Sequence, residues 1–353
     1  MTFCMKKWEG FEHGINFGGW LSQCDYSKDR LNNFITEKDF ETVKGWGLDH
    51  IRIPVDYNII QDDEFNFNNE GFGYIDFAID MCRKYGLNMI LDIHKTPGYS
   101  FDPFHNEVGF FADEKYQVNF YKIWEELAKR YGKYSNMLAF ELLNEITKKE
   151  YCDPWNRIST ECIKTIRKYA PDIKILVGGY YNNSAEAVKD LLMPYDENIV
   201  YNFHFYEPLL FTHQGAPWIA TMDTEFRCPF DMTYDEYEQL SDKYLCQAYA
   251  SFKQFGDMNQ KPNEEYFFKL LKEAVETAEE RNVPLYCGEY GVIDRVNPKE
   301  AVKWFREFHN MLKHNNIGSA IWSYKEMDFG ISDKRMDDVR DELIDILLHK
   351  CEE

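Results

Sequence analysis

The chain has 353 residues, of which 44% are hydrophobic and 17% aromatic, so it can form a large buried core and is not intrinsically disordered. Its 61 Asp and Glu outnumber its 40 Lys and Arg, which gives a formal net charge of −21 at pH 7. A chain this acidic repels phosphate backbones, anionic lipid and polyanionic substrates. We therefore expect no nucleic acid and no membrane as partners, and neutral substrates remain open.

The cysteines and the N-terminal segment bear on the cellular compartment. The nine cysteines form an odd set without a C-x-x-C spacing, which argues against a zinc module and a disulfide-stapled fold and favours a reducing compartment. No run approaches the 18 or so apolar residues of a spanning helix, and Met1–Lys7 is not followed by the apolar stretch of a secretory signal. We expect a cytoplasmic protein, and secretion remains open if a leader has been removed.

Short apolar runs recur along the whole chain. Continuous apolar runs are typical of strands buried on both faces, as in a parallel sheet covered by helices. The runs are Gly14–Trp20, Leu48–Val55, Leu87–His94, Met137–Asn144, Ile173–Gly178, Ile199–His204, Pro284–Glu289 and Gly318–Ser323.

Segments of helical period separate these runs. Thr36 and Asp39 predict a helix start by their capping-box-like spacing, and Gly86 predicts the end of a second helix. Two further helical patterns end at Gly132 and before Pro171. Eight βα units in one domain, residues 1–353, predict a closed (β/α)8 TIM barrel. The alternative is an open doubly wound sheet, but no G-x-G-x-x-G motif follows the first run.

One interval is too long for a βα unit. The segment Phe205–Val283 has about twice the length such a unit needs. Its last part, with Asn263 as N-cap, is the expected helix. The rest, roughly Leu209–Lys261, is predicted to be an inserted helical subdomain that leaves from the catalytic end of the sixth strand.

The inserted segment is rich in aromatic residues, too many to leave in solvent, so a folded cap is expected. One interpretation is that it walls the substrate cleft, with Trp218 as a stacking residue. The other is a stabilising subdomain packed away from the cleft. The aromatic residues are Phe211, Trp218, Phe226, Phe230, Tyr234, Tyr237, Tyr244, Tyr249, Phe252 and Phe255.

Two glutamates stand at the ends of predicted strands. Glu145 follows the fourth run and Glu289 ends the seventh. A carboxylate in such a place is costly to desolvate, so each needs a structural or chemical reason. A salt bridge at the barrel rim is one explanation. The other is an acid/base and a nucleophile at a glycosidic bond, which needs two carboxyl groups on nearby strands.

The motifs at the ends of successive runs resemble those of glycoside hydrolase family 5, the retaining cellulase family of the (β/α)8 superfamily. They follow the family's order over nearly the whole chain. The supporting stretches are Gly14–Trp20, Ile51–Pro54, Leu91–His94, Leu143–Glu145, Asn202–Tyr206, Gly288–Gly291 and Ile321–Tyr324.

The resemblance implies a role for each residue at the reaction centre. Glu145 matches the acid/base and Glu289 the nucleophile of a double displacement. Asn144 would hydrogen-bond the sugar 2-hydroxyl, a contact that strengthens in the transition state. Arg52 would donate to the Glu289 carboxylate and keep it ionised, and Tyr206 would supply a second hydrogen bond to it.

The resemblance also implies a sugar subsite. His94 and His204 would line the subsite before the scissile bond, and Trp322 would be its flat platform, because pyranose C–H faces stack on aromatic rings. Trp20 and Trp218 are further stacking candidates, although any one of these side chains can instead belong to the core. The two histidines lack a metal-binding spacing such as H-E-x-x-H, so we expect no metal and no cofactor.

The substrate implied by the resemblance is a neutral β-1,4-glucan, of the cellulose or mixed-linkage type, or its oligosaccharides, and we expect a monomer. β-Mannanase, β-mannosidase, β-glucosidase and β-1,3-glucanase activities remain open on the same scaffold, as does endo or exo action. Two alternatives from other classes are an inactive carbohydrate-binding barrel, which would need neither Glu145 nor Glu289, and a metal-dependent barrel hydrolase.

Overall fold

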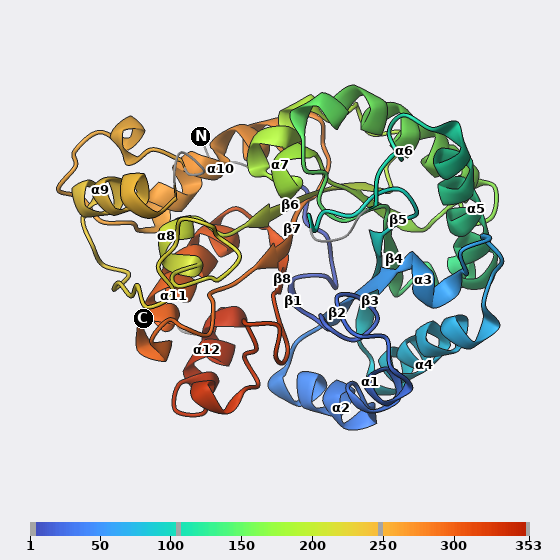
Figure 1. Cartoon of the computed structure of the whole chain (residues 1–353), viewed down its shortest axis with the longest axis horizontal. Coiled ribbons are helices and arrows are strands. Elements are labelled where there is room, and N and C mark those ends of the chain that lie inside the picture. The colour runs from blue at the N-terminus through green and yellow to red at the C-terminus, as the bar shows by residue number, and fades with distance from the viewer. Residues whose placement is uncertain (1–4, 104–106, 246–249, 351–353) are drawn as a thin grey trace.

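The computed structural model describes residues 5–103, 107–245 and 250–350. Eight parallel strands close a barrel in chain order, with helices around it (Figure 1), which confirms the predicted (β/α)8 fold. Each predicted run overlaps one strand. The strands are β1 (His13–Asn16), β2 (His50–Asp56), β3 (Asn88–Lys95), β4 (Leu138–Glu141), β5 (Lys174–Val177), β6 (Ile199–Phe205), β7 (Leu285–Tyr290) and β8 (Gly318–Ile321).

Helices and short helical turns connect the strands. The α segments are α1 (Lys28–Asn33), α2 (Glu37–Trp46), α3 (Tyr57–Ile60), α4 (Asn69–Tyr85), α5 (Glu114–Tyr131), α6 (Cys152–Arg167), α7 (Tyr180–Asn183), α8 (Leu209–Thr212), α9 (Tyr234–Tyr244), α10 (Glu264–Glu280), α11 (Pro298–His314) and α12 (Arg340–Leu347). The 3-10 turns are η1 (Gly132–Tyr134), η2 (Lys149–Tyr151), η3 (Ala185–Asp190), η4 (Phe252–Phe255) and η5 (Lys334–Met336).

The predicted helix boundaries have the expected local chemistry. At the start of α2, the Asp39 carboxylate accepts a hydrogen bond from the Thr36 backbone N–H over 2.7 Å. Helix α4 ends at Gly86, whose φ of 65° lies in the left-handed region that glycine adopts without strain. Helix α10 begins after Asn263, whose side chain accepts from the backbone N–H of Tyr266.

The amino end of the barrel lumen is apolar. Trp8 and Phe11, from the segment before β1, stack with ring centroids 4.0 Å apart. They belong to a small core cluster, separate from the main core, that fills this end of the lumen and so closes it to solvent. The strand residues of this cluster are Ile90, Ala139, Leu176, Val200, Tyr286 and Ala320.

The next level of the lumen is polar. Arg52, Asp92, Glu141 and Asn202, from four different strands, are all fully buried. Branched aliphatic side chains usually fill such positions in a (β/α)8 barrel. Because buried charges are costly unless they are paired, this level must be held together by its own ion pairs and hydrogen bonds. It forms the floor of the site described below.

Two strand pairs change register close to the carboxyl ends. Between β6 and β7, His204 pairs with Glu289 although the preceding pair involves Cys287, so Gly288 is an extra residue. A similar shift between β2 and β3 leaves His94 as the extra residue. Such bulges re-aim the side chains that follow them. The bulge in β7 places Glu289 opposite His204.

The segment between β6 and α10 holds α8, α9 and η4. Both α9 and η4 pack on Tyr266 of α10, through Tyr234 of α9 and Phe252 of η4, with ring centroids 5.8 and 5.5 Å from the Tyr266 ring. Helix α9 accordingly lies at the outer edge of the molecule beside α10 (Figure 1). Of the aromatic residues predicted to be buried in this segment, Phe211, Phe230, Tyr234, Tyr237 and Phe252 are buried, and Tyr249 lies outside the described residues.

Two sequence observations, on membrane spans and on cysteines, can be compared with the structure. Within the described ranges, no helix is both long and apolar enough to span a membrane. The six cysteines in those ranges, at positions 24, 82, 152, 162, 228 and 287, are free.

Candidate active site

The structure brings Glu145 and Glu289 together at the carboxyl ends of β4 and β7. A carboxylate oxygen of each and a ring nitrogen of His204 all lie within 4.8 Å of one another. His204 Nδ1 is 2.9 Å from Glu145 Oε1 and 3.7 Å from Glu289 Oε2. All three side chains are buried. The centre is therefore a compact pair of carboxyl groups with one imidazole beside both.

Arg52 is fixed beneath this pair. Its Nη1 donates to Glu289 Oε1 over 2.7 Å and to Asn16 Oδ1 over 2.9 Å. Its Nε and Nη2 donate to the two oxygens of Glu141 over 2.7 and 2.9 Å. The contact expected between Arg52 and Glu289 is present. Because the guanidinium is planar and held on several sides, it presents one rigid donor to that carboxylate.

The second oxygen of Glu289 has its own partner. Tyr206, which directly follows β6, donates its hydroxyl to Glu289 Oε2 over 3.2 Å. Burial, and then the neighbouring Glu289 carboxylate, raise the pKa of Tyr206 well above its ordinary value, so the phenol keeps its proton and remains a donor. Glu289 is thus held at both oxygens.

Glu145 has a different environment. Burial raises the pKa of Glu145, while a hydrogen bond from Asn182 Nδ2 to Oε2, over 2.9 Å, acts in the opposite direction. Its backbone is in the left-handed region, with φ 35°. The Tyr99 hydroxyl donates to the Glu145 carbonyl over 2.6 Å and accepts from the Thr147 N–H over 2.8 Å. These contacts fix the backbone that carries the carboxyl group.

The two histidines of the site are neutral at neutral pH. Burial lowers the pKa of His204 to about 4 and also lowers that of His94. The Asn183 amide nitrogen lies 3.4 Å from His204 Nε2, which fits Nε2 as an acceptor and Nδ1–H as the donor to Glu145. His94 Nδ1 lies 2.6 Å from Asp92 Oδ2, so its orientation is set by a buried carboxyl group.

Asp92 joins His94 to the floor of the site. Its Oδ2 also lies 3.1 Å from Arg52 Nη2. Burial raises the pKa of Asp92 to about 7, although the Arg52 charge opposes that shift. His94 and Trp322 lie parallel, with ring centroids 5.9 Å apart and an interplanar angle of 5°.

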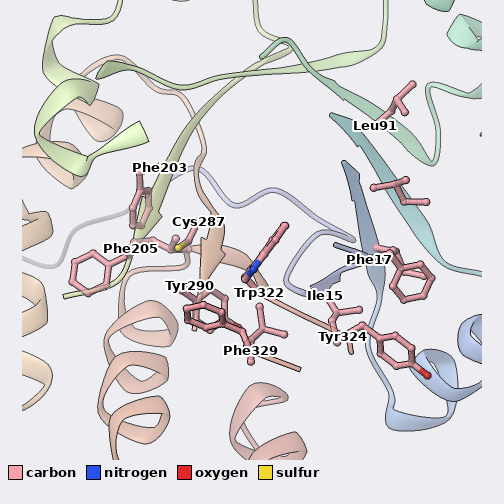
Figure 2. Packing of buried hydrophobic residues seen from close by; sticks show 14 of the residues in the cluster. Ile15, Phe17, Leu91, Phe203, Phe205, Cys287, Tyr290, Trp322, Tyr324 and Phe329 are labelled. Atoms are coloured by element: carbon pink, nitrogen blue, oxygen red, sulfur yellow. The ribbon is translucent and has the colours of Figure 1, made fainter. Parts of the chain in front are cut away.

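The indole of Trp322 points into the barrel. In Figure 2 it lies between β6 and β7 on one side and β1 on the other. Its ring lies against Gly18, where an added Cβ would come within 2.7 Å of it. The absence of a side chain at Gly18 therefore makes room for the indole. Trp322 as a whole is only 6% exposed, so a limited part of its surface can meet a ligand.

The two other tryptophan candidates differ. Trp20 is 1% exposed and its indole N–H donates to the Leu31 carbonyl over 2.9 Å. The prediction of Trp20 as a stacking residue is wrong, because the side chain is in the core under the β1–α1 segment. Trp218 is 42% exposed and lies edge-on to His213, which is in turn edge-on to Tyr206. The start of the inserted segment thus borders the site.

Asn144 has one free donor. Its Oδ1 accepts from Arg52 Nη2 over 3.0 Å, which fixes the amide orientation. Its Nδ2 is buried and has no hydrogen-bond partner among the described residues. A buried unpaired amide is unfavourable unless a ligand or water completes it. The site therefore offers a donor to a polar group that lies beside the two carboxylates.

Sequence reasoning gave no role to several residues of the site. Asp92 and Glu141 are carboxylates inside apolar runs, and the desolvation argument that marked Glu145 applies equally to them. Asn16 lies in one of the quoted motifs but carries no charge. Tyr99 and Asn182 come from loops, where no pattern in the sequence indicated that they would reach Glu145.

The three central side chains also have the spacing of a metal ligand set. The Arg52 guanidinium, 2.7 Å from Glu289, opposes the binding of a second cation at that carboxylate. That the reaction needs no metal ion therefore remains a prediction.

Comparisons with known proteins agree with this geometry. Residues 7–328 match the family model described as Cellulase (glycosyl hydrolase family 5). The chain is 43% identical to cellodextrinase A of Ruminococcus flavefaciens over 89% of this chain and 85% of that protein. It is 39% identical to endoglucanase C of Acetivibrio thermocellus over 96% and 98%, respectively. The crystal structure of clostridial cellulose synthase subunit Z from Clostridioides difficile aligns with a TM-score of 0.75 and 26% identity, over 96% and 99%.

Proposed function

This chain belongs to glycosyl hydrolase family 5, the cellulase family, and is a glycoside hydrolase; we propose that it cleaves β-1,4-linked glucan with retention of configuration. In the proposal Glu289 is the nucleophile and Glu145 the acid/base. The relatives named cellodextrinase and endoglucanase support a cello-oligosaccharide or cellulose-type substrate. The acidic chain agrees with a neutral glycan.

One observation carries the stereochemical part of the proposal. Oxygens of the two carboxyl groups approach within 4.8 Å of each other. Inverting glycosidases hold their carboxyl groups ~6.5–9.5 Å apart to make room for a water, whereas retaining enzymes hold them ~5–5.5 Å apart. The short separation supports direct attack by one carboxylate on the sugar.

The environments of the two carboxyl groups support the division of roles. Glu289 accepts hydrogen bonds from Arg52 and Tyr206, which fix the orientation of its carboxyl group and aim one oxygen at the anomeric carbon. Glu145 is buried without a cationic hydrogen-bond donor among the described residues, and its raised pKa suits a group that must carry a proton.

The reaction then proceeds in two displacements. In the first, Glu289 bonds to the anomeric carbon while Glu145 gives its proton to the departing glycosidic oxygen. In the second, Glu145 takes a proton from water as the water oxygen displaces Glu289. The unpaired Asn144 Nδ2 would donate to the sugar 2-hydroxyl, and His94 and Trp322 would line the same subsite.

Two experiments test the proposal. Proton NMR of the earliest product should show the β anomer, and the α anomer would contradict retention. Release of reducing sugar should be greatest on barley β-glucan, carboxymethylcellulose or cello-oligosaccharides. Faster release from mannan or laminarin would place the enzyme among the alternatives on this scaffold, and activity on none of these substrates would favour an inactive binding barrel.

A metal-dependent hydrolase is the second candidate, because Glu145, His204 and Glu289 have ligand spacing. The two mechanisms differ in their response to chelation. Under the proposal, dialysis against EDTA leaves kcat unchanged, whereas a metal-dependent enzyme loses activity and regains it with a divalent cation.

A further inference from the structure

Asp92 is a buried carboxyl group to which the proposed mechanism gives no role. It lies in β3 and is fully buried. Its Oδ2 is 2.6 Å from His94 Nδ1, whereas its Oδ1 has no hydrogen-bond partner among the described residues. An ionised carboxylate needs several donors to replace the water that it loses on burial, and its burial is costly without them. The surroundings of Asp92 therefore decide whether it keeps its charge.

Arg52 lies close to Asp92 but does not donate to it. Arg52 Nη2 is 3.1 Å from Asp92 Oδ2. A guanidinium has five N–H bonds, and in Arg52 each of them is directed at another acceptor. The acceptors are oxygens of Asn16, Glu141, Asn144 and Glu289. Both hydrogens of Nη2 are thereby used, so Arg52 acts on Asp92 through its charge alone.

The hydrogen bonds on the floor of the site are unequally shared. The guanidinium faces three carboxyl groups, those of Asp92, Glu141 and Glu289. Glu141 accepts two bonds from the guanidinium and one from Asn202, and Glu289 accepts one from the guanidinium and one from a tyrosine. Asp92 is bonded only to His94. Of the three, Asp92 therefore has the least support as an anion.

The charges around Asp92 also favour its neutral form. Burial raises the pKa of Asp92 to about 7. The Arg52 charge opposes that shift, and the carboxyl groups of Asp56, in β2, and Glu145, after β4, add to it. Burial lowers the pKa of His94, so its ring is neutral and carries one hydrogen. Below about pH 7 the Asp92–His94 pair therefore has two hydrogens to place.

The ring of His94 is held in one orientation. It lies parallel to Trp322, and Phe101 packs edge-on against it with ring centroids 5.1 Å apart. A flip that exchanged Nδ1 and Nε2 would break the 2.6 Å contact between Nδ1 and Asp92. Nδ1 is therefore committed to Asp92, and Nε2 is the nitrogen that remains for a ligand in the subsite beside Trp322.

We propose that Asp92 carries a proton on Oδ2 and donates it in a hydrogen bond to His94 Nδ1, so that His94 presents Nε2–H as a neutral donor to a sugar hydroxyl. The donor role rests on the proposed function, whereas the proton positions do not. When the pair loses a proton, the Asp92 proton passes to Nδ1 and the Nε2 proton leaves to solvent, which turns Nε2 into an acceptor. Asp92 is thus a positioning residue that sets whether His94 donates or accepts.

The proton on Asp92 can be observed in the resting enzyme by infrared spectroscopy. The difference spectrum of wild type minus Asp92→Asn should contain the C=O stretch of one protonated carboxylic acid well below pH 7, and this band should be absent well above pH 7. The Glu145 carboxyl group is present in both proteins, so its own band cancels.

Asp49 provides a matched control at the amino end of the barrel. It also contacts a histidine, since its Oδ1 lies 2.5 Å from His50 Nδ1. Burial raises the pKa of Asp49, but His50 and the backbone N–H groups of Glu12 and His13 outweigh burial and lower it overall. The difference spectrum of wild type minus Asp49→Asn should therefore show no protonated carboxylic acid at either pH.

The tautomer of His94 can be measured on the wild-type enzyme and so does not depend on the folding of a variant at Asp92. In ¹⁵N NMR of histidine-labelled protein, the His94 signals are those lost in His94→Gln. They should show the hydrogen on Nε2 well below pH 7 and on Nδ1 well above it.

The donor role is tested by kcat/KM for dinitrophenyl β-cellobioside. This ratio reports the first displacement, which needs little proton donation from Glu145 when the leaving group is activated. In wild type it should fall about 2- to 10-fold as the pH rises through about 7, as expected for the loss of one hydrogen bond. In Asp92→Asn this step should be absent, because an amide does not titrate.

Each failure has a distinct signature. No carboxylic acid band in the Asp92→Asn difference spectrum, or a hydrogen on His94 Nδ1 well below pH 7, would overturn the proposal. An equal step in kcat/KM for wild type and Asp92→Asn would overturn the donor role, because the titrating group would then be another residue. If the wild-type enzyme does not cleave the cellobioside at all, the proposed function is wrong and the donor role falls with it, while the band and the tautomer still test the proton positions.

Discussion

Glu141 and Arg52 form a bidentate ion pair inside the barrel, with Glu141 Oε2 2.7 Å from Arg52 Nε and Oε1 2.9 Å from Arg52 Nη2. Asn202 Nδ2 donates to the same Glu141 Oε1 over 2.9 Å. This pair leaves Arg52 Nη1 pointing at Glu289. Glu141 therefore positions Arg52, and Arg52 in turn positions Glu289, the proposed nucleophile.

Replacing Glu141 by Gln tests that relationship. Glutamine keeps the shape but cannot hold the guanidinium with two charge-assisted bonds, so Arg52 should lose its aim at Glu289. We expect kcat to fall about 10- to 100-fold with little change in KM. Losses of this size are typical when a residue that orients a metal ligand by a hydrogen bond is replaced. Asp196→Asn is the control, because Asp196 forms a bidentate pair with Arg167 far from the site. If both variants lose activity equally, Glu141 serves stability alone.

The roles of the two glutamates can be separated by the leaving group. Glu289→Ala should lose activity by several orders of magnitude on every substrate, because the covalent route disappears. Glu145→Ala should lose much less on aryl glycosides with an activated leaving group, which need little protonation. Azide should accelerate Glu145→Ala by attacking the glycosyl-enzyme. Equal losses on activated and natural substrates, without an azide response, would contradict the assignment.

The pH profile should respond to Asn182. Burial raises the pKa of Glu145, so its proton is retained to higher pH than on an exposed carboxyl group, and activity is lost as the pH rises through that pKa. The hydrogen bond from Asn182 opposes the rise. Asn182→Gly removes the bond while tolerating φ 58°, so the basic limb should move to higher pH, with kcat reduced by a few-fold at most. A limb that moves to lower pH, or does not move, would show that this hydrogen bond does not tune the acid.

Trp218 tests whether the inserted segment contributes to binding. Its ring is exposed at the border of the site, beside His213. Trp218→Ala should lower kcat/KM for a five-sugar substrate by a factor equivalent to ~1–3 kcal/mol, if the loss resembles that of a nucleobase stacked on an aromatic side chain, and much less for a two-sugar substrate. An identical drop for both lengths, or none, would assign the segment to stability.

The fold could be predicted because its signals are local. Buried parallel strands appear in the sequence as apolar runs. Capping residues such as Asn263 predict where a helix begins to within a few residues. Glu145 and Glu289 could be placed because strand ends meet at one edge of a barrel. The two register shifts could not be predicted, since a bulge leaves no pattern in one strand alone.

Other features depend on tertiary packing. The residues next to Trp20 in the sequence do not distinguish a side chain that faces the cleft from one that faces the core. In the structure its indole N–H donates to the Leu31 carbonyl, a partner 11 residues away, and the side chain is buried. The aromatic residues of the inserted segment predict that it is folded. Tyr234 of α9 packs on Tyr266 of α10, whereas Trp218 lies at the site, and no periodicity in the sequence encodes these contacts.

The most direct test of the account is to trap the covalent intermediate. In a 2-deoxy-2-fluoro-β-cellobioside with a dinitrophenyl leaving group, the fluorine slows both displacements, because it destabilises the positively charged transition states and removes the 2-hydroxyl contact expected from Asn144. The good leaving group restores the rate of the first displacement only, so the glycosyl-enzyme should form faster than it is hydrolysed. Peptide mass spectrometry should then find one fluorocellobiosyl group, and it should be on Glu289. A label on any other residue, or turnover without a label and with an α-anomeric product, would contradict the assignment of Glu289 as the nucleophile.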